Sequence, residues 1–134
     1  PIGNESSASP ALTVTIDATA PTDPAAAPDL DDASDTGPSN TDDITSDTTP
    51  TVSGAGGTTG DTVTLYADGT PVGTGTVQPD GSYSVTPDSP LTDGTPNLTV
   101  SFTDPSGSES AQSPALPSTL DSSAPTIPVI AGPI

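Results

Sequence analysis

Apolar residues alternate with small polar residues along the second half of the chain. The alternation includes Val63 and Leu65 in DTVTLYADG, Tyr83 and Val85 in GSYSVTP, and Leu98, Val100 and Phe102 in NLTVSFTD. A period of two residues is typical of strands with one buried face. No window has a sustained 3.6-residue apolar period, and Pro, Gly, Ser and Thr recur too often for a long helix. The pattern predicts an all-β fold.

Turn residues separate the alternating segments. ADGTP at 67–71 and QPDGS at 78–82 place Asp-Gly between extended segments, and this pair tolerates the positive φ of a hairpin turn. TDGTP at 92–96 and DPSGS at 104–108 turn the chain again. Strands about ten residues apart are typical of sandwiches. We therefore expect a β-sandwich of about seven antiparallel strands, near residues 50–54, 61–67, 71–77, 82–87, 97–103 and 111–120, with a separate strand from Leu12 to Ile16.

The chain contains an internal repeat. GNESSASPALTVTIDATAPTDPAAA begins at Gly3, and GSESAQSPALPSTLDSSAPTIPVIA begins at Gly107, which is 104 residues later. Within this register the two SPAL segments align, and Asp17 aligns with Asp121. The register predicts a tandem array in which residues 1–17 end one repeat, 18–27 form a Pro-rich linker, 28–121 form a complete domain, and 122–134 form a linker and the start of the next repeat.

The charge of the chain has one sign. It has no Lys, Arg or His and 18 acidic residues, which gives a formal charge of -18. The acidic side chains therefore have no basic side chain with which to pair. Phosphate backbones and anionic lipids repel such a polyanion, which excludes nucleic acids and membrane surfaces as expected partners. The sequence also has no apolar run near 18 residues and no basic, then apolar, leader, so we expect neither a transmembrane helix nor a signal peptide.

The residue types exclude several kinds of active site. Without Cys or His the sequence contains no disulfide, thiolate centre, zinc site or Ser-His-Asp triad. Carboxylate-pair catalysis normally adds aromatic platforms, whereas the aromatic residues here are Tyr66, Tyr83 and Phe102. We therefore expect a protein that is not an enzyme. We also expect it to be monomeric.

Aspartates are concentrated in DLDDASDTGPSNTDDITSD, from Asp29 to Asp47. Calcium prefers about six to eight hard oxygen ligands and tolerates irregular geometry, and this segment supplies carboxylate and amide oxygens around the turn-forming TGPSN. The alternative is a solvated acidic surface in which Asp side chains cap their own turns. The candidate calcium ligands are Asp17, Asp29, Asp31, Asp32, Asp35, Asn40, Asp42, Asp43, Asp104 and Asp121.

The segments PDLDDASDTGPSNTDDITSDTTPTVSG, GDTVTLYADGTPVGTGTV, DGSYSVTP and SFTDPSGSES resemble, in this order, the bacterial immunoglobulin-like extender repeat of giant surface adhesins. The resemblance covers nearly the whole chain. It implies an immunoglobulin-like sandwich on the bacterial cell surface, in a biofilm or ice-binding adhesin of the RTX type exported by type I secretion. It also implies neighbouring copies of the repeat in the same chain and several calcium ions at and near their junctions.

These observations favour a structural spacer that calcium stiffens. The alternative of a different class is an immunoglobulin-like module that itself binds a glycan or another surface, and a third is an accessory domain of an enzyme. Many similar copies in the parent gene would favour the spacer, whereas a single divergent copy beside an aromatic-rich region would favour the binding module.

Overall fold

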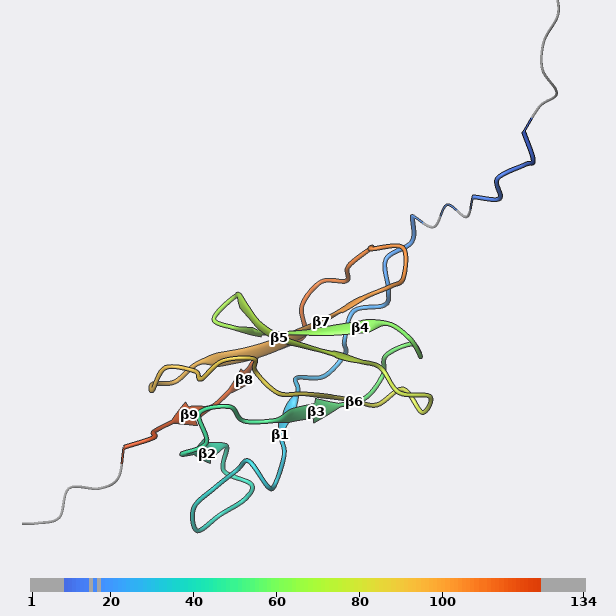
Figure 1. Ribbon diagram of the computed structural model, residues 1–134. Helices are drawn as coiled ribbons and strands as arrows, with labels where there is room; N and C mark the ends of the chain where they lie inside the picture. The colour runs from blue at the N-terminus through green and yellow to red at the C-terminus, as the bar shows by residue number, and fades with distance from the viewer. Residues whose placement is uncertain (1–8, 15, 17, 124–134) are drawn as a thin grey trace, which may run out of the picture.

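The computed structural model describes residues 9–14, 16 and 18–123, and this part of the chain contains strands and no helix. In the described residues no helix is long and apolar enough to cross a membrane. The strands are β1 (Asp29–Leu30), β2 (Ile44–Thr45), β3 (Val52–Gly54), β4 (Thr62–Ala67), β5 (Thr70–Thr76), β6 (Tyr83–Val85), β7 (Asn97–Thr103), β8 (Leu116–Pro117) and β9 (Thr119–Leu120) (Figure 1).

The strands form a sandwich of two sheets with a small third sheet at one end. One layer has the order β1-β3-β6, and the facing layer has the order β5-β4-β7-β8 (Figure 1). All pairs in these two layers are antiparallel. The third sheet is the parallel pair of β2 and β9. The predicted all-β sandwich is confirmed.

The alternating residues form the core between the layers. Val63 of β4 lies opposite Phe102 of β7, and Leu65 lies opposite Val100, so the apolar sides of both strands face inward. The ring of Tyr83 meets that of Phe102 edge-on, with centroids 5.7 Å apart. The core consists of Leu30, Val52, Val63, Leu65, Val77, Tyr83, Val85, Leu98, Val100, Phe102 and Leu116.

The expected hairpin at ADGTP is present between β4 and β5. Asp68 and Gly69 both have positive φ, at 49° and 83°, and Ala67 pairs with Thr70 across this two-residue loop. Positive φ at both central residues is the requirement of a type I′ turn, which explains why Asp-Gly occupies it.

The single strand predicted for residues 111–120 is wrong. Instead, β8 pairs with β7 and β9 pairs with β2, with Ser118 between them. Two serines replace regular ladder bonds before β8: the hydroxyls of Ser110 and Ser113 accept the N–H groups of Phe102 and Val100, each at 3.0 Å. The backbone N–H groups of Ser110 and Ser113 also donate to the carbonyls of Phe102 and Val100, each at 2.8 Å, so side-chain and backbone bonds together hold this segment against β7.

The strand predicted from Leu12 to Ile16 is also wrong for the described residues of that segment. Leu12, Val14 and Ile16 lie outside any strand and are largely exposed. An isolated apolar alternation has no sheet on which to pack its apolar side. Conversely, β1 and β2 lie inside the Asp-rich segment, for which the sequence predicted a loop. The β2–β9 pair is parallel, whereas antiparallel strands were expected.

Two glycines allow β5 and β6 to approach at the open edge of the sandwich. A Cβ on Gly73 would lie 2.8 Å from the carbonyl oxygen of Thr86, and one on Gly75 would lie 2.7 Å from that of Ser84. We expect Gly75→Ala to lower the free energy of unfolding by about 1–3 kcal/mol, because the methyl group must push the two backbones apart. Urea titration measures this change.

The matched control is Thr74→Ala, on the exposed side of the same strand. It should change the free energy of unfolding by less than about 0.5 kcal/mol. If Gly75→Ala were as mild as this control, β5 would have room to move away from β6, and the close approach would not contribute to stability.

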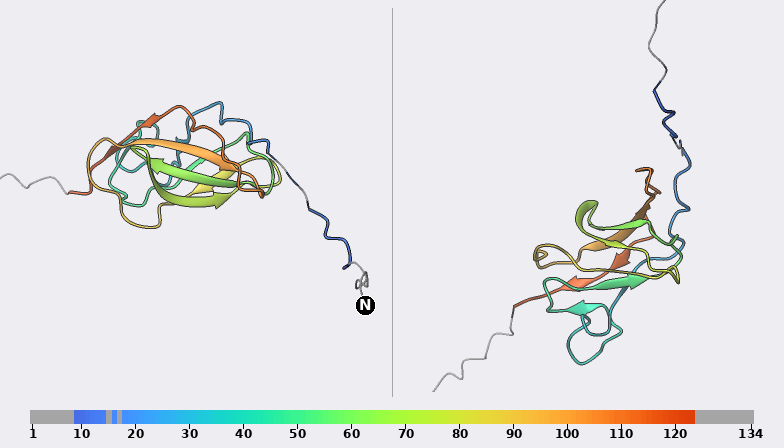
Figure 2. Two further views of the ribbon diagram at one scale, coloured as in Figure 1. Left: turned by 90° about the horizontal axis from the view of Figure 1, so that it is seen from above. Right: turned by 45° about the vertical axis from the view of Figure 1, so that its right-hand side comes forward.

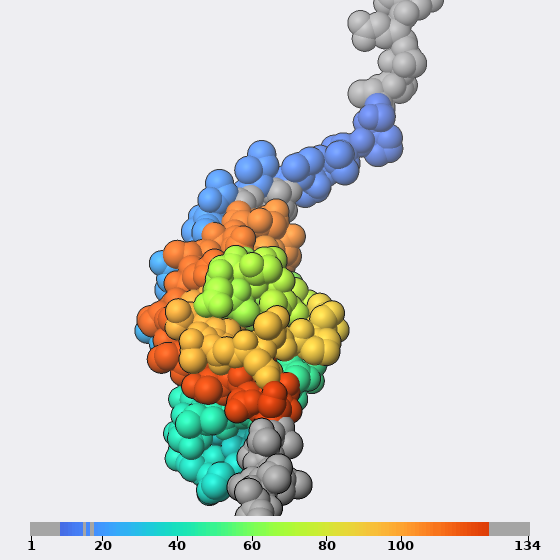
Figure 3. Space-filling model, turned by 90° about the vertical axis from the view of Figure 1, so that its left-hand side faces the viewer, coloured from blue at the N-terminus to red at the C-terminus, as the bar shows by residue number. Residues whose placement is uncertain are grey.

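The described ends of the chain leave the sandwich at opposite ends (Figures 1 and 2). We define the entry end as the connector at 18–27 with the β7–β8 loop, and the exit end as the β1–β2 loop with the β2–β9 pair. The Asp23 carboxylate accepts the Ala111 N–H at 2.9 Å, which ties the connector to the β7–β8 loop. At the exit end, the β1–β2 loop lies beside the last described residues (Figure 3).

Candidate metal centre

Most of the predicted calcium ligands lie at the exit end. Asp31, Asp32, Asp35, Asn40, Asp42 and Asp43 belong to the β1–β2 loop, Asp29 begins β1, and Asp121 follows β9. Asp104 lies instead in the β7–β8 loop at the entry end. Asp17 lies outside the described residues.

Asp35 is the most unusual of these residues because its carboxylate is buried. The residue is 3% exposed, and its Oδ2 accepts the N–H of Asp43 at 3.0 Å. Its Oδ1 is also buried and accepts no hydrogen bond from the described residues. A buried carboxylate oxygen without a donor is costly unless a cation neutralises it. No basic side chain exists in the chain to do so.

The surrounding charges add to this cost. The pKa of Asp43 is raised by its partial burial and then by the negative charges of Asp29, Asp35 and Asp42. Three other carboxylates therefore lie within electrostatic reach of Asp43. A divalent cation bound there would relieve the repulsion, and its hard oxygen ligands are of the type that calcium prefers.

The sandwich holds the loop around Asp35 in place. The N–H groups of Ser34 and Asp35 both donate to the carbonyl of Asp31, at 2.7 and 2.8 Å, which forms a tight turn. The buried Thr45 hydroxyl donates to the carbonyl of Ser34, and the Ser34 hydroxyl accepts the Thr51 N–H at 2.9 Å. The carboxylate of Asp35 is thus positioned by bonds to β2 and to the start of β3.

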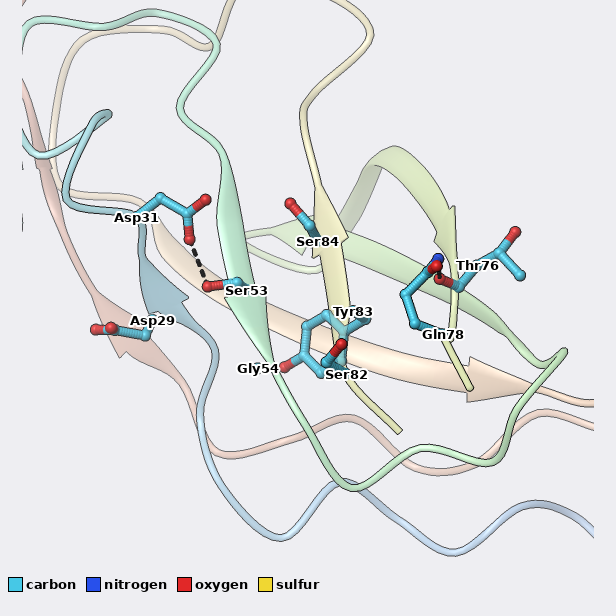
Figure 4. A pocket seen from close by; sticks show the side chains of 9 residues that line it. All are labelled: Asp29, Asp31, Ser53, Gly54, Thr76, Gln78, Ser82, Tyr83 and Ser84. Carbon is cyan, nitrogen blue, oxygen red and sulfur yellow. Dashed lines mark hydrogen bonds between the residues drawn. The ribbon is translucent and has the colours of Figure 1, made fainter. Parts of the chain in front are cut away.

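Other predicted ligands face away from Asp35 or serve their own turns. The Asp31 carboxylate accepts the hydroxyl of Ser53, and with Asp29 it lines a groove of about 590 Å³ on the β1-β3-β6 layer (Figure 4). Asp32 and Asn40 are exposed. In the described ranges, no three acidic side chains converge closely enough to hold a metal ion by themselves. Ligands beyond the carboxylates, such as backbone carbonyls and water, would have to complete the coordination of calcium at Asp35.

Asp42 and Asp121 meet at a second groove, of about 370 Å³, between the loop and the chain exit. The Asp42 carboxylate accepts the Ile44 N–H at 3.2 Å, and the Asp121 carboxylate accepts the Ser123 N–H at 3.0 Å. Both therefore act as turn caps, the alternative role considered for aspartates in the sequence. Their position nevertheless brings two carboxylates together where the chain leaves the domain.

Sequence reasoning missed two features of these sites. Ser34 and Thr45 position Asp35, but their role depends on pairing between distant segments and leaves no local pattern. Asp61 is buried beside Asp104 at the entry end and was read as the start of a strand. The signal for Asp61 was present: DTVTLY and NLTVSFTD both carry an Asp at the end of a strand, and an antiparallel pairing of the two strands brings these ends together.

Both tyrosines contact other residues of the sandwich. Tyr83 is 3% exposed, and the half-buried Tyr66 donates its hydroxyl to Glu109. The Ser101 hydroxyl donates to the same Glu109 oxygen at 2.6 Å, and these two bonds lower the pKa of Glu109. Tyr83, the aromatic residue in the groove of Figure 4, is therefore too buried to form a stacking platform for a sugar ring.

Comparison with known proteins supplies a family for this architecture. A family model described as a bacterial Ig-like domain matches residues 21–122, which includes most of the connector and every strand. No curated protein matches the chain.

Proposed function

The chain belongs to the bacterial Ig-like domain family, and from this premise we propose that it is a structural spacer of a large bacterial surface adhesin, stiffened by calcium. Domains of this family commonly occur in extracellular surface proteins and are generally not enzymes. The proposal goes beyond family membership in three respects, which are the extender role, the adhesin of the RTX type and the calcium ions.

The position of the chain ends is the observation that supports a spacer. The connector reaches one end of the sandwich and the chain leaves from the other (Figures 1 and 2). Asp17 and Asp121 occupy equivalent places in the 104-residue register that separates Gly3 from Gly107. Domains joined in this way follow one another end to end, so each added repeat lengthens the array and carries a distant binding tip further from the cell.

Asp35 supports the calcium part of the proposal. Its donor-less Oδ1, with the negative charge of Asp43 nearby, would hold the ion at the exit end. The bound ion would supply the positive charge that the chain lacks. Its remaining ligands would come from backbone carbonyls, water or a following repeat.

Two backbone bonds connect the end of the β1–β2 loop and β2 to the last residues of the domain. The Asp43 carbonyl accepts the Thr119 N–H, and the Thr45 carbonyl accepts the Asp121 N–H, both at 2.9 Å. Fixing the loop with an ion therefore fixes the direction in which the chain leaves the domain. The Pro-rich linker then adds its own stiffness, because such segments favour extended conformations. Together these effects would make the junction between two repeats rigid.

A chain of three consecutive repeats tests the proposal. We expect small-angle X-ray scattering to give an extended rod in millimolar calcium, and a shorter, broader distribution of dimensions after EGTA is added. Magnesium in place of calcium is the control for ionic strength and general charge screening. Equal maximum dimensions with calcium and with EGTA would mean that proline stiffness alone sets the shape, and compact particles in calcium would contradict the spacer itself.

The alternative function is direct binding of a glycan or another surface. The observation in its favour is the polar groove lined by Asp29, Asp31, Gln78 and the serines around Tyr83 (Figure 4). We place it second, because this groove is open, strongly acidic at one side and without an exposed aromatic face.

A further inference from the structure

Three large apolar side chains near the start of the described chain lie outside any strand. Leu12, Val14 and Ile16 are 84%, 64% and 88% exposed. They recur at every second residue, and residues 6–16 contain no charged side chain in a chain whose formal charge is -18. Residues at this spacing share one side of an extended backbone. Contiguous exposed apolar surface of this kind typically marks an interaction site.

The 104-residue register indicates which site these three side chains fit. It aligns them, in order, with Leu116, Ser118 and Leu120. The aligned residues are 7%, 6% and 2% exposed, and Leu116 belongs to the core between the layers. The same spacing that leaves three apolar side chains exposed near the start of the chain therefore recurs at its end on residues that are buried.

The bonds that hold the segment from Leu116 to Leu120 involve mainly the backbone. Both β8 and β9 pair with their neighbours over only two residues each. Leu120 exchanges an N–H and a carbonyl bond with Gly94, and the Ser118 N–H donates to the carbonyl of Pro96 at 3.3 Å. Another extended segment in the same register can make these bonds, because they do not depend on the side chain. The side chains then decide which segment fits.

The side chains of the N-terminal segment suit this site. Both end positions keep an apolar side chain of similar volume, which cores tolerate well. Thr13 in place of Pro117 supplies a backbone N–H and a residue that favours strands. Val14 in place of Ser118 loses the hydroxyl bond to Pro96, but it keeps the backbone N–H and buries a larger apolar group.

We propose that Leu12, Val14 and Ile16 form a donor strand that binds a second copy of this domain, in the place of that copy's β8 and β9. The donor precedes the connector at the entry end, whereas the acceptor site lies beside β2 at the exit end (Figure 1). Donor and acceptor are therefore different surfaces, so two copies bind head to tail and further copies can add. The proposal depends neither on calcium nor on the spacer role.

The exchange is close to balanced in free energy. A copy that accepts a donor releases its own last strands, which exposes Leu116 and Leu120 while Leu12 and Ile16 become buried. The domain's own segment also has the advantage of belonging to the same chain, which gives it a high effective concentration. We therefore expect the parent protein to be mostly monomeric in dilute solution and to exchange strands in a small fraction of molecules.

Disulfide trapping between two full-length chains tests the proposal, because the chain has no cysteine of its own. In the aligned register, Thr13 of the donor would lie opposite Asn97 of the acceptor, where Pro117 lies in the monomer. Directly opposed residues have Cα atoms about 4.5–5.5 Å apart, which a disulfide accommodates. Thr13→Cys is mixed with Asn97→Cys in a glutathione redox buffer, and the 13–97 disulfide is quantified by mass spectrometry.

The control for chance collision is a mixture of Thr13→Cys with Thr74→Cys, which places the second cysteine on the exposed side of β5. We expect at least about tenfold more of the 13–97 disulfide than of the 13–74 disulfide, because strand pairing raises the effective concentration of the two thiols. Leu12→Ser with Ile16→Ser in the Thr13→Cys chain should lower the 13–97 yield to the control level, since the donor loses its apolar side.

Both serine substitutions are at exposed positions, so they leave the fold of the domain unchanged. A 13–97 yield equal to that of the 13–74 control would overturn the proposal. A high 13–97 yield that survives Leu12→Ser with Ile16→Ser would also overturn it, because the two chains would then meet without the apolar donor.

Discussion

Replacing Asp35 with Asn is expected to remove most of the thermal stabilisation that calcium gives the parent protein. An ion bound only by the folded state stabilises it by about 2.7 kcal/mol at a hundredfold excess over its Kd. For a domain of this size that corresponds to a rise in Tm of roughly 10–20 °C. Without the charge on the buried carboxylate of Asp35, the ion loses its least solvated anionic ligand, and most of this shift should vanish.

The same variant should be nearly as stable as the parent in EGTA. The side-chain oxygen of Asn can still accept the N–H of Asp43, so the bond that orders the loop is kept. Removing the charge also relieves the repulsion between residue 35 and Asp43, which offsets the burial of an amide group. We expect the Tm in EGTA to change by less than the equivalent of about 1 kcal/mol.

Asp68→Asn and Asp80→Asn are the matched controls. Both aspartates lie in turns that Asn also suits. The Asp68 carboxylate accepts the N–H of Asn97 at the start of β7, and the Asp80 carboxylate accepts the N–H of Ser82 within its own turn. Each control removes one negative charge, as Asp35→Asn does, so a general charge effect would appear in all three variants. Thermal melts followed by circular dichroism, with calcium and with EGTA, make the comparison. A full calcium shift in Asp35→Asn would place the stabilising ion elsewhere.

The long strands could be predicted from the sequence because their signals are local. In β4 and β7 the buried apolar residues alternate regularly, and the Asp68-Gly69 turn fixes the hairpin that joins β4 to β5. In the segment from 111 to 120, by contrast, prolines remove backbone donors and serine hydroxyls replace ladder bonds. A mixture of side-chain and backbone bonding of this kind has no period, so the sequence indicated one strand where the structure has two.

Composition indicated the segment that holds the candidate site, but it could not tell which aspartates cap turns and which are buried. Carboxylate oxygens of the kind that binds calcium are chemically the same as those that cap turns, and the Asp-rich segment contains a buried carboxylate as well as turn-capping ones. Asp42 and Asp47 accept N–H groups two residues further along, which is local turn chemistry. Asp35 differs only in its burial, which depends on Thr45 and on the packing of β1 against β3. Burial of this kind is a tertiary property that spacing alone does not reveal.

Replacing Phe102 with Ala should have the largest effect on stability of any single substitution in the core. Phe102 is the largest fully buried side chain and contacts Tyr83 edge-on. Truncation of a buried Phe costs about 3–5 kcal/mol, against a total of about 5–15 kcal/mol for a typical domain. The chain has no disulfide to limit the loss. We expect Tm to fall by roughly 15–30 °C in EGTA, measured by circular dichroism.

Calcium should restore part of this stability, because the ion proposed at Asp35 would bind the β1–β2 loop at the exit end, whereas Phe102 belongs to the core between the layers. Effects of distant sites are usually additive, so the calcium-dependent rise in Tm should be similar in the parent and in Phe102→Ala. Val14→Ala, a truncation at a residue that is 64% exposed, should leave both melts unchanged. A loss of less than about 1 kcal/mol in Phe102→Ala would show that the sandwich does not depend on its apolar core. A calcium shift that disappears in this variant would instead show that the proposed calcium-binding loop and the core are coupled, so that truncating Phe102 disturbs the site.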